Sequence, residues 1–143
     1  MIMPDLNLLI FAHDRASAKN DVALRWWRRA LDAEEVFLSW ITVWGFIRVT
    51  TGAHVKPSLE IRQAKAYVDL WLSRPNVSMI EPGRDHLNLS LKIAEQTQVS
   101  ATKMSDVFLA ALAIESAATL CTDDSFFSRI DNLSVINPLI SDP

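Results

Sequence analysis

The sequence predicts a single α/β domain over residues 1–143, with three layers in the order α/β/α around a central parallel sheet of four to five strands. Short apolar runs alternate along the chain with longer runs that have helical spacing, and neither a repeat nor a linker interrupts them. A chain of 143 residues that is 50% hydrophobic can also bury one sizeable core. Ligands of such sheets bind beyond the carboxyl ends of the strands, so functional residues are expected there.

Five short segments are expected to be strands because they are apolar and rich in β-branched or aromatic residues: 2–3, 36–40, 77–80, 119–122 and 135–136. Helices are expected at 5–13, about 18–34, 41–51, 59–73, 87–98, and from about 105. Gly52 is expected to end one of these helices as its C′ residue. In the helix at 87–98, the apolar face is expected to consist of Leu87, Leu91 and Ala94.

The tryptophans are expected in the core and at an interface. Trp26, Trp44 and Trp71 fall at helical spacing with other apolar residues. Trp26 and Trp27 are adjacent, and adjacent residues cannot face the same side of a helix. One of these two rings is therefore expected to meet a partner.

Composition narrows the class of protein. A net charge of −3 and a pI of about 5.5 argue against a protein that coats nucleic acid non-specifically, but a nuclease with catalytic carboxylates remains compatible. The single cysteine, Cys121, excludes an internal disulfide framework and a CxxC zinc site, which fits a reduced, cytoplasmic setting. The first residues are not expected to form a signal peptide, and no apolar stretch is expected to span a membrane.

Four acids are expected near one rim of the sheet. Asp5 follows the first strand, while Asp123 and Asp124 follow the strand at 119–122. Asp106 is the only carboxylate in an apolar helical run and opens the helix that precedes that strand. If these two strands are neighbours, the acids repel one another unless a cation binds them, and oxygen ligands favour Mg²⁺ or Mn²⁺.

Each acid also has a simpler interpretation. Asp5 could be an N-cap, and Asp106 could do no more than favour the positive end of its helix. Asp123 and Asp124 could be ordinary turn residues. The combination of acids at one rim is harder to explain by turns and caps than any single member.

Three motifs carry a resemblance to a known family. They are MPDLNLL at 3–9, SDVFLAALA at 105–113 and LCTDDSFFSRIDNL at 120–133, followed by a closing NPL at 137–139. Together they resemble the PIN domain, and specifically the VapC-type toxins of bacterial toxin–antitoxin pairs. The resemblance extends over essentially the whole chain and implies a three-layer, PIN-like fold.

The resemblance implies that three acids bind metal and carry catalysis: Asp5, Asp106 and Asp124. Asp123 falls on a variable position and ranks second. Asn7 and Thr122 match positions that hydrogen-bond the carboxylates. Arg48 lies on the helix expected beside the pocket, where it could contact a phosphate or make a surface ion pair.

Two residues depart from the family's pattern. Gly45 stands where the family usually has a Glu on the helix after the second strand. Phe126 stands where a second Asp would follow Asp124. The first departure leaves three ligating acids instead of four, although a W-x-G-F-x-R-x-x-T form resembles one toxin subgroup.

The function implied is that of a Mg²⁺- or Mn²⁺-dependent endoribonuclease, the toxin of a toxin–antitoxin pair. It would cleave structured cellular RNA, such as tRNA or ribosomal RNA, with a metal-activated water. The implied partners are the RNA substrate, a cognate antitoxin and a second copy in a homodimer.

Two alternatives remain open. A catalytically weakened PIN domain could serve as an RNA- or partner-binding module, given Gly45 and Phe126. A receiver-like phosphoacceptor would also gather acids at a sheet rim. It needs paired acids after the first strand, a phosphoacceptor Asp after the third and a lysine after the fifth. The sequence offers Asp5 alone, Glu81 after the third strand, and no such lysine.

Overall fold

The computed structural model describes residues 1–140 and contains a five-stranded sheet in the order β3-β2-β1-β4-β5, in which every pairing is parallel. The strands are β1 (Ile2–Pro4), β2 (Val36–Leu38), β3 (Val77–Met79), β4 (Thr119–Cys121) and β5 (Val135–Ile136). This order confirms the predicted parallel α/β sheet. It also makes β1 and β4 neighbours, with Ile2 opposite Thr119 and Pro4 opposite Cys121.

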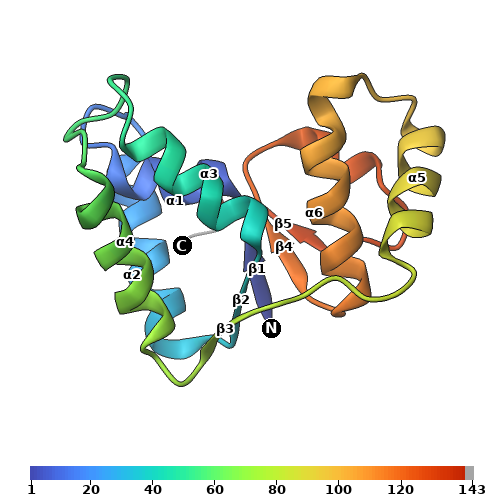
Figure 1. Cartoon of the computed structure of the whole chain (residues 1–143), viewed down its shortest axis with the longest axis horizontal. Coiled ribbons are helices and arrows are strands. Elements are labelled where there is room, and N and C mark those ends of the chain that lie inside the picture. The colour runs from blue at the N-terminus through green and yellow to red at the C-terminus, as the bar shows by residue number, and fades with distance from the viewer. Residues whose placement is uncertain (141–143) are drawn as a thin grey trace.

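Helices cover both faces of this sheet (Figure 1). One face carries α1 (Leu6–His13), α2 (Asn20–Ala33), α3 (Trp40–Thr50) and α4 (Ile61–Leu72). The other carries α5 (His86–Thr97) and α6 (Met104–Glu115). The short 3₁₀ helix η1 (Ala101–Lys103) directly precedes α6, and η2 (Ser125–Arg129) follows β4. The predicted α/β/α layering is therefore confirmed for residues 1–140.

The strands divide the apolar residues into two cores because successive side chains point to opposite faces of a sheet. In β1, Ile2 packs on the core formed with α1–α4, while Met3 belongs to the core formed with α6. In β4, Leu120 belongs to the α6 core and Cys121 to the other. Both faces of the central strands are thus buried, as expected for a parallel sheet.

Element boundaries differ from the prediction where a cap decides them. The segment at 36–40 ends as a strand at Leu38, because the Ser39 hydroxyl accepts a hydrogen bond from the Thr42 N–H at 3.1 Å and starts α3. Trp40 is therefore the first residue of α3 and not the last of β2. Gly52 follows the C-cap Thr51 and so occupies the C′ position that was expected, although its φ is not positive.

Trp26 and Trp27 are both buried within the chain, so the argument that only one of these adjacent rings can be packed inside the chain is wrong. Trp27 packs edge-on against Trp71 of α4, with ring centroids 5.4 Å apart. Trp26 points to the other flank of α2, beside Ile2 and Cys121. The exposed tryptophans are Trp40 and Trp44 of α3 instead.

The apolar face expected for α5 is wrong for Leu87 and Leu91, whereas Ala94 packs against the α6 core as expected. Leu87 and Leu91 are 60% and 45% exposed, whereas Ser90, Ile93 and Thr97 are buried. The buried hydroxyls of Ser90 and Thr97 donate to carbonyl oxygens one turn earlier in the same helix, both at 2.7 Å. A small polar residue satisfied in this way can face a core.

Residues 1–140 include no helix that is both long and apolar enough to cross a membrane.

Candidate metal and active site

The site begins where β1 and β4 end side by side. The Asp5 N–H donates to the Cys121 carbonyl at 2.8 Å, which continues the ladder one residue past β1. The Thr122 hydroxyl, directly after β4, donates to Asp5 Oδ2 at 2.7 Å. The expected contact between Thr122 and a carboxylate is present, and parallel pairing of the two strands is its cause.

Asp5 occupies the N-cap position of α1, but its side chain makes no capping hydrogen bond. The simpler interpretation is therefore correct for the position of Asp5, but the side chain is held by Thr122 and not by a capping hydrogen bond. Burial raises the pKa of Asp5 to about 6, against the lowering effect of the Thr122 hydrogen bond, and the negative charges of Asp106 and Asp124 raise it further. The residue is 5% exposed, so this carboxylate is held in an unfavourable setting that a cation would relieve.

Asp124 combines a structural contact with a contact inside the site. Its Oδ1 accepts the Phe126 N–H at 2.8 Å and caps η2, and its own N–H donates to the Thr122 hydroxyl at 3.0 Å. Its other oxygen, Oδ2, accepts from Lys103 at 2.8 Å. Burial alone would raise the pKa of Asp124, but the hydrogen bonds from Lys103 and Phe126 hold it below its ordinary value.

Lys103, which the sequence interpretation did not include, lies between two of the three acids. Its ammonium is 2.8 Å from Asp124 Oδ2 and 3.2 Å from Asp106 Oδ2, and it sits 5.0 Å from the centre of the Phe126 ring. Asp106 is in the first turn of α6, one turn after Lys103. The spacing K-x-x-D on one helical turn was the signal in the sequence that could have predicted this pair.

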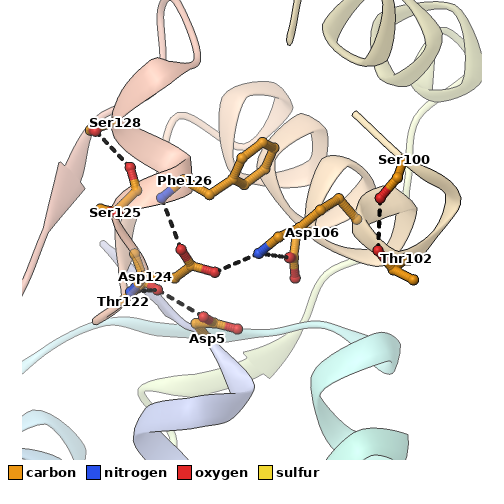
Figure 2. Close-up of polar contacts among 10 residues, drawn as sticks. Asp5, Ser100, Thr102, Asp106, Thr122, Asp124, Ser125, Phe126 and Ser128 are labelled. Atoms are coloured by element: carbon orange, nitrogen blue, oxygen red, sulfur yellow. Dashed lines mark hydrogen bonds and ion pairs between the residues drawn. The ribbon is translucent and has the colours of Figure 1, made fainter. Parts of the chain in front are cut away.

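The three acids come from three different elements and converge on one region (Figure 2). Together with the Lys103 ammonium they leave two negative charges when all are ionised, which is the charge that a divalent cation neutralises. Carboxylate oxygens are also the donors that Mg²⁺ and Mn²⁺ prefer. In donor chemistry and in charge, the residues fit such an ion.

The geometry adds a condition to this fit. Among residues 1–140, no three His, Cys, Asp or Glu side chains are close enough together to form a ready set of metal ligands. The position between Asp106 and Asp124 is instead occupied by the ammonium of Lys103, which pairs with both acids.

The remaining candidate residues lie outside this cluster. Asp123 forms an ion pair with Lys19 and accepts from the Asn137 amide at 2.8 Å, and the Lys19 hydrogen bond lowers the pKa of Asp123. Asn7 is exposed on α1, and in the described part of the chain it makes no side-chain hydrogen bond to the acids. Arg48 is exposed in the last turn of α3, at the opposite end from Ser39, and was expected beside the pocket.

Gly45 is explained by a close approach of α3 to α1. A Cβ atom at this position would lie 2.5 Å from Cδ2 of Leu6. Leu6 is the residue directly after Asp5, so the Glu that the family pattern expects here would have to displace Leu6 to reach the acids. Phe126, the other departure, supplies the ring beside Lys103 where the pattern has an acid.

Comparison with known proteins identifies the family. The sequence model of the PIN domain matches residues 2–133. The chain belongs to the PIN domain family. It is 33% identical to ribonuclease VapC33 of Mycobacterium tuberculosis (strain CDC 1551 / Oshkosh), over 97% of this chain and 99% of that protein. Ribonuclease VapC37 of strain ATCC 25618 / H37Rv is 29% identical, over 93% and 94% respectively.

Solved structures share the fold of this PIN domain. VapBC2 from Rickettsia felis, bound to a DNA fragment from its promoter, superposes with a TM-score of 0.70 at 21% identity, covering 96% of this chain and 98% of that one. VapBC-1 from nontypeable Haemophilus influenzae gives 0.69 at 21% identity with the same coverage. At this level of identity the likeness concerns the fold alone.

Proposed function

We propose that this PIN domain is a Mg²⁺- or Mn²⁺-dependent endoribonuclease that acts as the toxin of a toxin–antitoxin pair. The observation that carries the proposal is the convergence of Asp5, Asp106 and Asp124 from three elements on one region that is short of positive charge. Full-length relatives named as VapC ribonucleases support the choice of RNA as substrate. Structured RNA such as tRNA or ribosomal RNA is the proposed target, in the cytoplasm.

Each residue of the site has a separate role in the proposed reaction. Asp5 and Asp106 would hold the ion, and Thr122 keeps Asp5 in position through its 2.7 Å hydrogen bond. Asp124, fixed by η2, would complete the set or orient the attacking water. An ion held there would supply positive charge for the scissile phosphate and a more acidic water for in-line attack.

The antitoxin is proposed to dock on the α1–α4 side of the sheet. A cavity of about 380 Å³ opens there between α1, α2 and α4, with Leu9, Trp27 and Trp71 in its wall. Arg15 and Arg28 also line it, so a segment with apolar anchors and acidic flanks would fit. The exposed pair Trp40 and Trp44 is a candidate contact for a second copy in the proposed homodimer.

The weakened binding module remains the second candidate. The observation in its favour is the Lys103 ammonium, which holds Asp106 and Asp124 in the described structure while Gly45 supplies no fourth acid. A protein of this kind would bind RNA or a partner through the same rim without cutting the strand.

Expression in cells separates the two candidates. The wild-type chain should arrest growth and nick cellular RNA, while Asp5→Asn and Asp106→Asn should abolish both effects. Asp131→Asn, a change at an exposed turn acid outside the cluster, is the matched control and should behave as wild type. Co-expression of a short protein from the adjacent upstream reading frame should relieve the arrest. Equal behaviour of wild type and Asp106→Asn would contradict the enzyme and favour the module.

A further inference from the structure

The feature that the proposed function leaves unexplained is a cation already present inside the acid cluster. The Lys103 ammonium makes two ionic contacts, at 2.8 Å with Asp124 and 3.2 Å with Asp106. These are two of the three acids proposed to bind the ion. An ammonium on Oδ2 of both acids repels a divalent cation that would bind the same oxygens, so the two compete for this place.

The surroundings of Lys103 hold its ammonium at this place. Phe126 presents its ring 5.0 Å from the ammonium, a cation–π contact that adds to the two carboxylates. Lys103 also ends η1 directly before α6, so its backbone is fixed by two helical segments. Its side chain remains 37% exposed, however, and long enough to turn out into solvent without a backbone movement.

The third acid, Asp5, lies outside the contacts of Lys103. Asp5 makes no described contact with Lys103; its hydrogen-bond partner is Thr122. Its carboxylate is therefore the one that receives no compensation from Lys103, whose single positive charge offsets one of the two negative charges of Asp106 and Asp124. A divalent cation would bind all three acids, whereas the Lys103 ammonium pairs with only two of them.

We propose that Lys103 is the resident cation of the acid cluster, which stabilises Asp106 and Asp124 in the metal-free protein and must leave that place before all three acids bind a divalent ion. This inference rests on the proposed function, since it concerns the same site. Two consequences follow. The affinity for a divalent ion is lower than it would be without the Lys103 ammonium. The metal-free protein is also more stable to unfolding than it would be if none of the three acids had a cation beside it.

Metal affinity of Lys103 variants tests the proposal. Binding of Mn²⁺ to the full chain is measured by the loss of the free-ion signal in electron paramagnetic resonance, which does not depend on activity. Lys103→Met should bind Mn²⁺ at least about tenfold more tightly than wild type, or about 1.4 kcal/mol. In EDTA the same variant should unfold at a lower temperature than wild type, and added Mn²⁺ should raise its Tm by more.

Two further variants control for general charge effects. Lys103→Arg keeps a cation that can reach both carboxylates, so its affinity should be no higher than that of wild type. Lys19→Met removes the lysine that pairs with the neighbouring turn acid Asp123, outside the cluster. Because screening weakens such distant charges, its affinity should change by less than about twofold.

A measurement on the wild-type chain keeps the proposal testable if Lys103→Met does not fold. The Lys103 ammonium should give a ¹⁵N–¹H NMR signal that is protected in EDTA, with Lys103→Arg used to assign it. Added Mg²⁺ should shift this signal to the position of a solvated lysine. A signal that stays unchanged while Mg²⁺ binds would overturn the proposal.

The outcomes distinguish this inference from the proposed function. If wild type and Lys103→Met bind Mn²⁺ equally well and wild type cleaves RNA, the inference is wrong and the ribonuclease stands. If neither binds Mn²⁺ and neither cleaves RNA, the metal-dependent function itself is wrong, and the inference falls with it. Binding by Lys103→Met alone would support the lysine as the barrier to the ion.

Discussion

Asp5→Asn should stabilise the metal-free protein, and the gain should grow with pH. The pKa of Asp5 is raised from 3.8 to about 6, mainly by burial. A carboxyl whose pKa is higher in the folded state favours folding below pH 3.8, and this contribution is lost as the pH rises through 6. The full shift corresponds to about 3 kcal/mol, at 1.36 kcal/mol per pH unit.

Urea denaturation in EDTA at several pH values measures this effect. Asparagine can still accept the Thr122 hydrogen bond, so the change removes the charge and little else. The stability advantage of Asp5→Asn over wild type should widen by about 2 kcal/mol between pH 4.5 and 7.5. The lowered pKa values of Asp123 and Asp124 act below this window and are common to both proteins. An advantage that is independent of pH, or a loss that grows with pH, would refute the reasoning.

Three further substitutions test the packing around the site by the same urea assay. Thr122→Val should lower the free energy of unfolding by about 1–3 kcal/mol because it removes both hydrogen bonds of a buried hydroxyl. Thr122→Ser keeps the hydroxyl and should lower this free energy by less. Equal losses for the two variants would contradict the role of the hydroxyl. Gly45→Ala should change the free energy of unfolding more favourably in a Leu6→Ala background than in wild type, by about 1 kcal/mol, since the Leu6 side chain blocks the new Cβ. If the effects of the two substitutions on this free energy are additive, there is no such clash. Trp71→Ala should lower the free energy of unfolding by about 3–5 kcal/mol because the Trp71 side chain is buried. The Trp44 side chain is 63% exposed, so Trp44→Ala should change this free energy by no more than about 0.5 kcal/mol. Similar values for the two variants would contradict the core assignment.

The sequence was sufficient to predict the frame of the site. Asp5 and Thr122 each follow a short apolar strand, and parallel strands end at the same edge, so their contact follows from the order of elements. The neighbouring position of β1 and β4 was the one assumption required, and the sheet order confirms it. The ranking of Asp124 above Asp123 came from the family resemblance, and in the structure Asp124 contacts Lys103 whereas Asp123 accepts from the Asn137 amide.

Lys103 could not be assigned from the sequence because its role depends on a tertiary contact. The spacing to Asp106 shows that the two can meet on a helical turn, but many such pairs lie on solvated surfaces. Only the packing of η1 and α6 against the turn after β4 brings Asp124 to the same ammonium. A side chain that bridges segments distant in sequence has no local signature.

The two errors in the helices have a common physical origin. Periodicity assigns one buried face to a helix, but α2 is covered on two flanks, so Trp26 and Trp27 are both buried. In α5, hydroxyls satisfied by their own helix let Ser90 face the core and leave Leu91 exposed. Periodicity alone does not report how many neighbours a helix has or how a polar side chain is satisfied.

RNA cleavage by the purified protein is the most direct test of the proposed ribonuclease. Total cellular RNA is incubated with wild type or Asp106→Asn, in Mg²⁺, in Mn²⁺ and in EDTA, and the fragments are mapped. Wild type should produce discrete fragments only when a divalent cation is present, and Asp106→Asn should produce none. Cleavage that persists in EDTA, or that is equal in the two proteins, would contradict a metal-dependent nuclease built on these acids.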